Sequence, residues 1–129
     1  MSIHVELIVR ETQARGRGVF AGAAIPAGTL MESADVIVIP ESGLKALDAS
    51  VLGDYYFRWG EDESQGAIAL GYGSLYNHSY TPNARYVKRF DRGTIDFIAL
   101  RDIAAGEEIR TNYTGDPEGR EPLWFKVVE

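Results

Sequence analysis

Hydrophobic residues occur along this chain mostly in short runs with the two-residue period of β-strands. Residues 3–10 alternate between apolar and more polar side chains, which predicts a strand. A β-branched run over residues 36–39, ahead of Pro40, predicts a buried strand, and residues 94–100 predict another after an Asp-Arg-Gly turn. The pattern therefore predicts a mostly β protein.

One segment has helical periodicity instead. Between Ser42 and Val51 the apolar side chains recur at helical spacing, Ser42 is a candidate N-cap, and Gly53 is a candidate stop signal. The 14 glycines and 5 prolines are spread over the whole chain, with no linker or low-complexity tract. This distribution predicts a fold of many short strands and turns, with one or two short helices.

A short motif occurs twice in the chain. The pattern A-x-x-x-I-x-A-G starts at Ala21 and ends at Gly28, and it starts again at Ala99 and ends at Gly106. Each copy follows an apolar pair and predicts a strand, a tight turn with glycine at positive φ, and a return strand. Two such units predict a pseudosymmetric β fold.

The composition fits a single domain, residues 1–129. A chain of 129 residues with 45% hydrophobic residues is long enough to bury one core. It has no cysteine, which excludes disulfides and cysteine-bound metal, and its two histidines lack nearby glutamates at metal-ligand spacing, so no metal site is predicted. Without an apolar run long enough to cross a membrane or a signal-peptide profile, we expect a cytoplasmic or nuclear protein.

Net charge narrows the choice of partner. The formal charge is −6, whereas direct nucleic-acid binding requires a basic face, so we expect no direct binding to nucleic acid. The basic stretch between Arg85 and Arg92 is predicted to be the solvated edge of a hairpin. An acidic protein favours a cationic partner such as a peptide rich in lysine and arginine.

The first glycine cluster, residues 15–21, matches G-x-G-x-x-A, the outline of a dinucleotide-binding fingerprint. That fingerprint must open a helix, and Gly22, Pro26 and Gly28 make a long helix after it improbable. Two interpretations remain: a plain tight turn, or a loop whose backbone closely approaches a ligand.

Two further clusters carry polar groups. Residues 71–83 contain Asn77, His78 and Ser79, where a structural role for the lone histidine is the alternative to a functional one. No G-x-S-x-G elbow is present, which argues against a hydrolase. In residues 105–113, Glu107 and Glu108 are neighbours that would point to opposite faces of a strand, which favours a charged turn over an acid–base pair.

Taken in order, these three clusters resemble the SET-domain family of S-adenosylmethionine-dependent protein lysine methyltransferases. The resemblance covers residues 8–113, and its nearest match is the minimal viral type, in residues 69–73 and 76–79. It implies a β-clip fold of short curved sheets. In that fold the N-H-S segment and the C-terminal segment cross in a pseudoknot, and residues 114–129 form a C-terminal flanking segment.

The resemblance also implies residue roles. Tyr113 would be the catalytic tyrosine, and either Trp124 or Phe125 would close over the adenine of the cofactor. The methionine part of S-adenosylmethionine would be held by Gly16, Arg17, Gly18, Asn77 and His78. The channel for the substrate lysine would be lined by Tyr55, Tyr72 and Thr111.

The chain departs from the family pattern at several points. Tyr80 stands where the family often has cysteine, and the zinc-binding cysteines are absent. Thr111 stands where many members have an aromatic that limits methylation, which predicts room for di- or trimethylation. The expected substrate is a basic protein or histone tail, and so small a chain is compatible with a homodimer. Two alternatives remain: a non-catalytic peptide- or cofactor-binding module, and a β-clip domain that binds another ligand.

Overall fold

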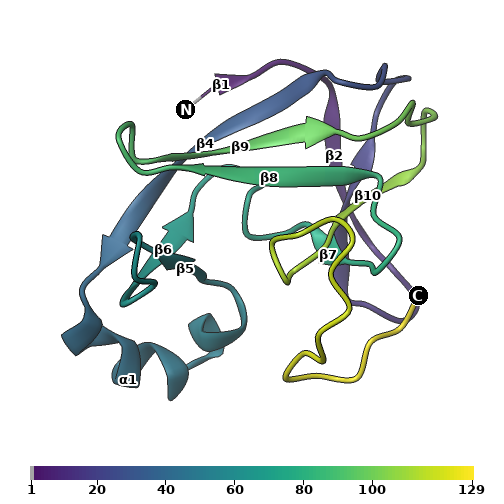
Figure 1. The fold of residues 1–129 in the computed structure, drawn as a ribbon. Helices are drawn as coiled ribbons and strands as arrows, with labels where there is room; N and C mark the ends of the chain where they lie inside the picture. Colours follow the sequence, from purple (N-terminus) through teal and green to yellow (C-terminus); the bar gives the residue numbers. More distant parts are fainter. Residues whose placement is uncertain (1) are drawn as a thin grey trace.

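The computed structural model describes residues 2–129, which form two β-sheets and a short run of helical turns (Figure 1). Met1, the first residue of the predicted domain, lies outside the described residues. The strands are β1 (Ser2–Ile3), β2 (Leu7–Glu11), β3 (Arg17–Ala21), β4 (Leu30–Ile39), β5 (Phe57–Trp59), β6 (Gln65–Ala69), β7 (Asn77–His78), β8 (Ala84–Arg89), β9 (Thr94–Ala99) and β10 (Glu108–Thr111). The helical segments are η1 (Glu41–Gly43), α1 (Leu44–Asp48) and η2 (Val51–Asp54).

The larger sheet has the order β5-β6-β4-β9-β8, with β1 paired to the first part of β4. The strand predicted over residues 3–10 is therefore divided: β1 joins this sheet and β2 joins the smaller one. The strand predicted over residues 94–100 is confirmed as β9, and the turn before it has Gly93 at a φ of 65°.

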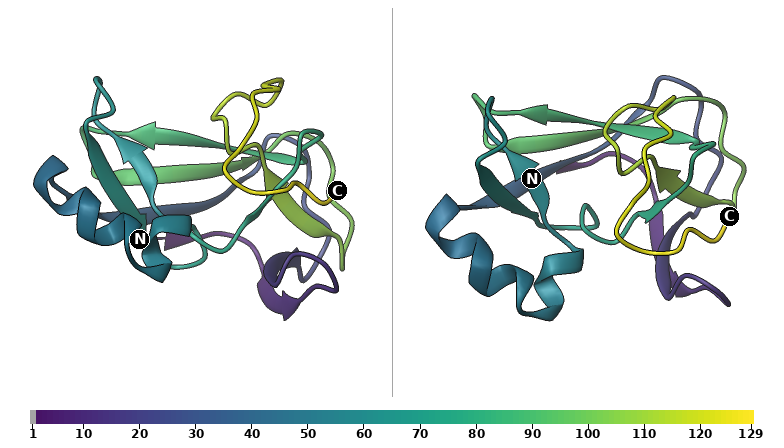
Figure 2. Two further views of the ribbon diagram at one scale, coloured as in Figure 1. Left: turned by 90° about the horizontal axis from the view of Figure 1, so that it is seen from below. Right: turned by 60° about the horizontal axis from the view of Figure 1, so that its bottom comes forward.

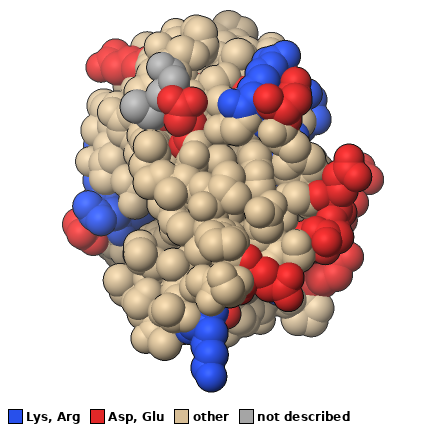
Figure 3. Space-filling model, turned by 90° about the vertical axis from the view of Figure 1, so that its left-hand side faces the viewer, with Lys and Arg blue, Asp and Glu red and all other residues tan. Residues whose placement is uncertain are grey.

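The expectation that residues 36–39 are buried is wrong for Ile37 and Val38, whereas Val36 is partly buried against the core. They form the end of the ten-residue strand β4, where Ile37 is 52% exposed and Val38 is 41% exposed. Pairing with β9 stops at Asp35, so only β6 accompanies this end of β4. The face of the molecule that carries this end of β4 has few charged side chains in its middle (Figure 3).

The smaller sheet has the order β2-β3-β10-β7. Strand β10 is antiparallel to β3 and parallel to β7, which places Arg110 opposite Asn77 and Thr111 opposite His78. Segments far apart in the sequence are therefore side by side at the end of β10. Beyond it, residues 114–129 loop past β7 (Figure 2).

The repeated motif forms a pair of matching turns, as predicted. Ile25 and Ile103 bond each other in both directions, with N–H to carbonyl distances of 2.8 Å. The amide of Gly28 donates to the carbonyl of Ala99 (2.8 Å), and the amide of Gly106 donates to the carbonyl of Ala21 (2.7 Å). Gly28 and Gly106 have φ of 81° and 84°, a region that disfavours side chains.

The helix predicted between Ser42 and Val51 is wrong in length and capping. It is divided into η1, the five-residue α1 and η2, and none of these buries a residue fully. The side chain of Ser42 caps nothing, whereas Ser50 accepts a bond from the amide of Leu52 at the start of η2. Without a buried apolar stripe, little packing energy supports a longer helix. No helix within residues 2–129 is long and apolar enough to cross a membrane.

Candidate active site

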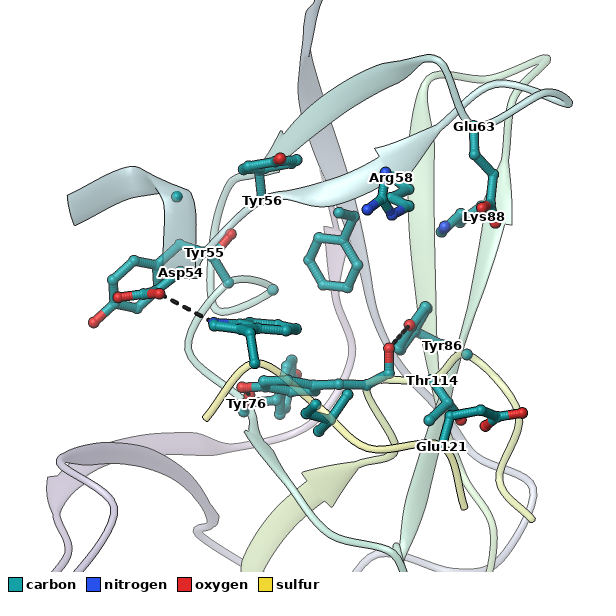
Figure 4. A pocket seen from close by; sticks show the side chains of 18 of the residues that line it. Asp54, Tyr55, Tyr56, Arg58, Glu63, Tyr76, Tyr86, Lys88, Thr114 and Glu121 are labelled. Atoms are coloured by element: carbon teal, nitrogen blue, oxygen red, sulfur yellow. Dashed lines mark hydrogen bonds between the residues drawn. The ribbon is translucent and has the colours of Figure 1, made fainter. Parts of the chain in front are cut away.

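A cavity of about 1110 Å³ opens between η2, β5, β8 and the C-terminal segment (Figure 4). One wall is built by the 48–58 segment, and Tyr76, Tyr86 and the segment after β10 close the other sides. The aromatic residues that line it are Tyr55, Tyr56, Phe57, Tyr76, Tyr86, Tyr113 and Trp124. Such a lining suits an extended, partly apolar ligand.

Tyr113 follows the end of β10 and is held at several of its atoms. Its hydroxyl donates to the carbonyl of Tyr76, and its amide donates to Nδ1 of His78 (3.0 Å). Its own carbonyl accepts a bond from the hydroxyl of Tyr86 (3.3 Å). Burial and the nearby Tyr55 raise the pKa of the Tyr113 phenol, so the hydroxyl stays protonated and acts as a donor at neutral pH.

Trp124 and Tyr55 extend this aromatic wall toward solvent. The Trp124 ring stacks on Tyr113 with centroids 6.1 Å apart and planes inclined by 16°. Its indole N–H donates to Oδ1 of Asp54 (3.1 Å), a bond that crosses from the C-terminal segment to η2 (Figure 4). A cation that enters the cavity therefore meets ring faces, which attract it.

A second pocket, of about 270 Å³, is lined by residues 14–15, 77–78 and 125–128 and by Tyr113. The amide nitrogen of the Asn77 side chain donates to the carbonyl of Arg17 (3.1 Å) and to Oε2 of Glu108 (2.8 Å). A Cβ at Gly18 would lie 2.8 Å from that amide nitrogen and still closer to the Glu108 carboxylate. Because Gly18, the second glycine of the motif, has no side chain, Asn77 and Glu108 can pack directly against the backbone of β3.

Two buried side-chain nitrogens in the described part of the chain lack a hydrogen-bond partner, Nε of Arg15 and Nε2 of His78. Both residues line the smaller pocket. Burial lowers the pKa of His78, and because Nδ1 accepts from the amide of Tyr113, the neutral ring carries its proton on Nε2. The smaller pocket therefore offers unpaired donors to a ligand with acceptor atoms.

Tyr113 is the residue that lines both cavities. Trp124 faces the larger cavity and the next residue, Phe125, lines the smaller one, so the C-terminal segment passes between them. Two ligands, one in each cavity, would therefore both contact Tyr113. Such an arrangement suits the transfer of a group from one ligand to the other.

The C-terminal segment is fastened beside the N-H-S motif. The hydroxyl of Tyr80 donates to the carbonyl of Glu121 (2.8 Å). The Glu129 carboxylate accepts bonds from the hydroxyl of Ser79 (2.7 Å) and from the amide of Tyr80 (3.0 Å). These bonds hold the residues that wall the smaller pocket.

Two residues expected in the lysine channel do not line the larger cavity. Thr111 is 1% exposed within β10, and the side chain of Tyr72 packs partly buried against the core. Their roles in the channel stay predictions, whereas Tyr55 and Tyr113 do line this cavity. Two further lining residues, Tyr76 and Tyr86, were not predicted from the sequence. Each lies in an apolar or strand-like stretch, where an aromatic residue is equally typical of the core.

The basic stretch between Arg85 and Arg92 is only partly a solvated edge. Arg85 and Arg92 are exposed, but Arg89 pairs with Asp96 (3.1 Å). The Arg89 side chain is still 40% exposed, but Lys88 lines the larger cavity, so the prediction of a plain hairpin edge is wrong for Lys88. Three consecutive residues of β8, Tyr86, Val87 and Lys88, line this cavity.

Comparison with known proteins agrees with this geometry. The SET domain family model matches residues 16–114, and the chain belongs to the SET-domain family. A histone-lysine N-methyltransferase of Schizosaccharomyces pombe, described as specific for H3 lysine 37, is 36% identical over 125 residues. The match covers 96% of this chain and 80% of that protein.

A solved structure shares the fold. The crystal structure of a proposed histone methyltransferase of Plasmodium falciparum aligns with a TM-score of 0.64 and 24% sequence identity. The alignment covers 86% of this chain and 95% of that one. The mostly β architecture with one short α-helix is therefore that of a SET domain.

Proposed function

We propose that this protein transfers a methyl group from S-adenosylmethionine to the ε-amine of a lysine in a basic protein. The observation that carries the proposal is the meeting of the two cavities at Tyr113. The cofactor would occupy the smaller pocket and the substrate peptide the larger cavity, with the lysine side chain directed toward the phenol. Family membership and the named activity of the yeast relative support this assignment.

The residues of the smaller pocket fit S-adenosylmethionine. The unpaired nitrogens of Arg15 and His78 are donors suited to acceptor atoms such as its carboxylate, and Gly18 keeps the contact of β3 with Asn77 and Glu108 free of a Cβ. We propose that Gly16, Arg17, Gly18, Asn77 and His78 hold the methionine part. Phe125, which lines this pocket, then serves the adenine better than Trp124, which faces the larger cavity.

When bound, the cofactor would supply a methyl group on a sulfonium centre, whose carbon a neutral amine can attack in line as the neutral thioether leaves. The protein must remove water, align the amine and favour its deprotonated form. The aromatic lining of the larger cavity supplies the low-polarity path. The Tyr113 hydroxyl, fixed on the carbonyl of Tyr76, and that carbonyl itself mark where the reacting groups are aligned.

Charge favours a basic substrate. Five carboxylates line the larger cavity, from Asp48, Asp54, Glu63, Asp116 and Glu121, against two cations, from Arg58 and Lys88. A lysine- and arginine-rich segment would be attracted there, as in a histone tail, the substrate class named for the yeast relative.

We further propose that residues 1–129 act as one SET domain and that the protein works in the nucleus or cytoplasm. We also propose that it forms a homodimer and that it produces di- or trimethyllysine.

The test is transfer of labelled methyl groups from S-adenosylmethionine to core histones and to other basic proteins. We expect labelled lysines with the wild-type protein. The Tyr113→Phe variant should lose about 100-fold or more in kcat, because the phenol aligns the reacting groups. Mass spectrometry of the labelled lysine reports the number of methyl groups, and only monomethyllysine would contradict the proposed multiplicity.

Calorimetric titration with S-adenosylmethionine separates the alternatives. Cofactor binding without transfer to any basic protein would indicate a non-catalytic binding module. Absence of cofactor binding would reject the methyltransferase and point to a β-clip domain for another ligand. Full activity in Tyr113→Phe would reject the role of this residue alone.

A further inference from the structure

A carboxylate buried beneath the larger cavity has no role in the chemistry described so far. Glu32 lies in β4 and its exposed fraction is 0%. The hydroxyl of Tyr76 donates to its Oε1 (2.9 Å), and the amide of Tyr72 donates to its Oε2 (2.9 Å). Because burying a carboxylate costs free energy even when it is bonded, its place in the core calls for an explanation beyond packing.

The two bonds attach the 72–76 turn to the core sheet at both of its ends. The Tyr76 ring is itself buried and stacks on Phe97, with centroids 4.5 Å apart and planes inclined by 28°. The carbonyl of Tyr76 is the group that accepts the Tyr113 hydroxyl. One chain of contacts thus runs from Glu32 through Tyr76 to the phenol in the active site.

We infer that Glu32 is a positioning residue for Tyr113: by holding Tyr72 and Tyr76 it fixes the carbonyl that orients the phenol. This inference rests on the proposed methyltransferase function. It assigns to Glu32 an effect on the rate of transfer and none on the binding of the cofactor. Asn77, which follows Tyr76, is held separately by Arg17 and Glu108.

The variant to examine is Glu32→Gln, which keeps the shape of the side chain and changes one acceptor into a donor. If that donor faces the amide of Tyr72, this bond is lost. If it faces the hydroxyl of Tyr76, the hydroxyl must accept instead of donate, and a neutral bond replaces a stronger bond to a carboxylate, so the turn is held less firmly. We expect kcat to fall about 10- to 100-fold, because a shift on the ångström scale at the phenol is enough. The calorimetric Kd for S-adenosylmethionine should stay within about twofold, and so should KM for the peptide.

Asp96→Asn is the matched control. Asp96 is also a buried carboxylate, 4% exposed, but it bonds Ser33 and Arg89 on the opposite face of the same sheet. Both variants should lower the urea midpoint of unfolding, and only Glu32→Gln should lower kcat. Tyr76→Phe, which keeps the carbonyl and removes one partner of Glu32, should lower kcat as well and be non-additive with Glu32→Gln.

Three results would overturn the inference: wild-type kcat in a folded Glu32→Gln protein, an equal kcat loss in Asp96→Asn, or strict additivity with Tyr76→Phe. If the wild-type protein methylates nothing, the proposed function fails instead. In that case NMR of ¹³C-labelled tyrosine still decides the role of Glu32. The Tyr113 ring resonance should move in Glu32→Gln and stay in Asp96→Asn, and an unmoved resonance would reject the inference.

Discussion

Tyr113 is bound through its hydroxyl, its amide and its carbonyl to partners from separate parts of the chain. These partners are Tyr76, His78 and Tyr86, which lie on the turn before β7, on β7 and on β8. A tyrosine at the end of a strand would ordinarily be free to change rotamer. Three attachments hold this one where both cavities meet, which is the kind of preorganisation that alignment of two reactants requires.

The Tyr86→Phe variant tests the weakest attachment. It removes the 3.3 Å bond to the carbonyl of Tyr113, a neutral hydrogen bond of about 1 kcal/mol. We expect kcat to fall about three- to tenfold, well short of the loss in Tyr113→Phe. Tyr56→Phe is the control, because Tyr56 lines the same cavity but its hydroxyl bonds Asp48. Equal losses in the two variants would show that the attachment does not matter.

His78 predicts a pH dependence of stability. Burial lowers its pKa in the folded protein, an effect that the nearby Glu129 opposes and Arg110 adds to. The unfolded chain therefore binds the proton first as the pH falls. The contribution of His78 to the free energy of unfolding is therefore complete above about pH 6.5, and it is lost as the pH falls through the folded pKa.

Urea unfolding at pH 5.0 to 7.5 measures this dependence. In His78→Asn the side-chain oxygen can still accept from the amide of Tyr113, but it does not titrate. We expect the wild-type midpoint to decrease toward pH 5 and the variant to lose most of that slope. His4, the other histidine, is present in both proteins, so it cancels in the comparison. Parallel slopes would contradict the prediction.

The functional role of a residue could be predicted from the sequence where the residue belongs to a motif. Asn77, His78 and Tyr113 carry motif chemistry, and the structure brings them together around the smaller pocket. Glu32 and Tyr86 carry no motif, since one is a lone carboxylate in a strand and the other a strand aromatic. Their partners lie 44 and 27 positions away, and local patterns do not encode such pairs.

At the scale of elements, the twin turns follow from their glycines. Gly106 has a φ of 84° and open space where a Cβ would point, so strain alone decides the cost of a side chain. We expect Gly106→Ala to lower the free energy of unfolding by about 1 kcal/mol, and Gly106→Asn to lower it by less, because asparagine tolerates this conformation better. Urea midpoints measure both. An alanine variant as stable as the wild type would contradict the prediction.

The C-terminal segment yields a prediction on cofactor affinity. Glu129→Gln weakens the attachment of this segment to Ser79 and Tyr80, so the wall of the smaller pocket becomes looser. We expect the Kd for S-adenosylmethionine to rise about three- to tenfold, the equivalent of about 1 kcal/mol. Glu118→Gln is the control, since Glu118 lies in the same segment but outside both cavities. Titration calorimetry would show the difference, and equal affinities would reject it.

The elements themselves were predictable where the chain carries a local signal. The turn at Gly93 and the twin turns at Gly28 and Gly106 need a positive φ, which the glycine at each position indicates in the sequence. The helix was overestimated because Leu44, Leu47 and Val51 have the right spacing, although α1 spans only five residues. The exposure of Ile37 depends on where β9 stops pairing, which is a property of another segment.

For the whole molecule, the net charge of −6 predicts that a basic substrate is guided to the protein. Raising ionic strength shortens the Debye length from about 10 Å at 0.1 M to about 3 Å at 1 M. We expect kcat/KM for a basic peptide to fall about fivefold or more over this range, while kcat at saturating peptide changes little. Steady-state kinetics at several salt concentrations test this, and an unchanged kcat/KM would contradict it.

Strand β10 is a central strand of its sheet, yet it is the last strand in the sequence. On a ribosome, β3 and β7 would therefore emerge while the place between them is still unfilled. Until β10 arrives, β3 presents an unpaired edge that can join another chain. The sheet that positions Tyr113 and protection from aggregation would thus be completed in the same late event, after residues 108–111 leave the exit tunnel.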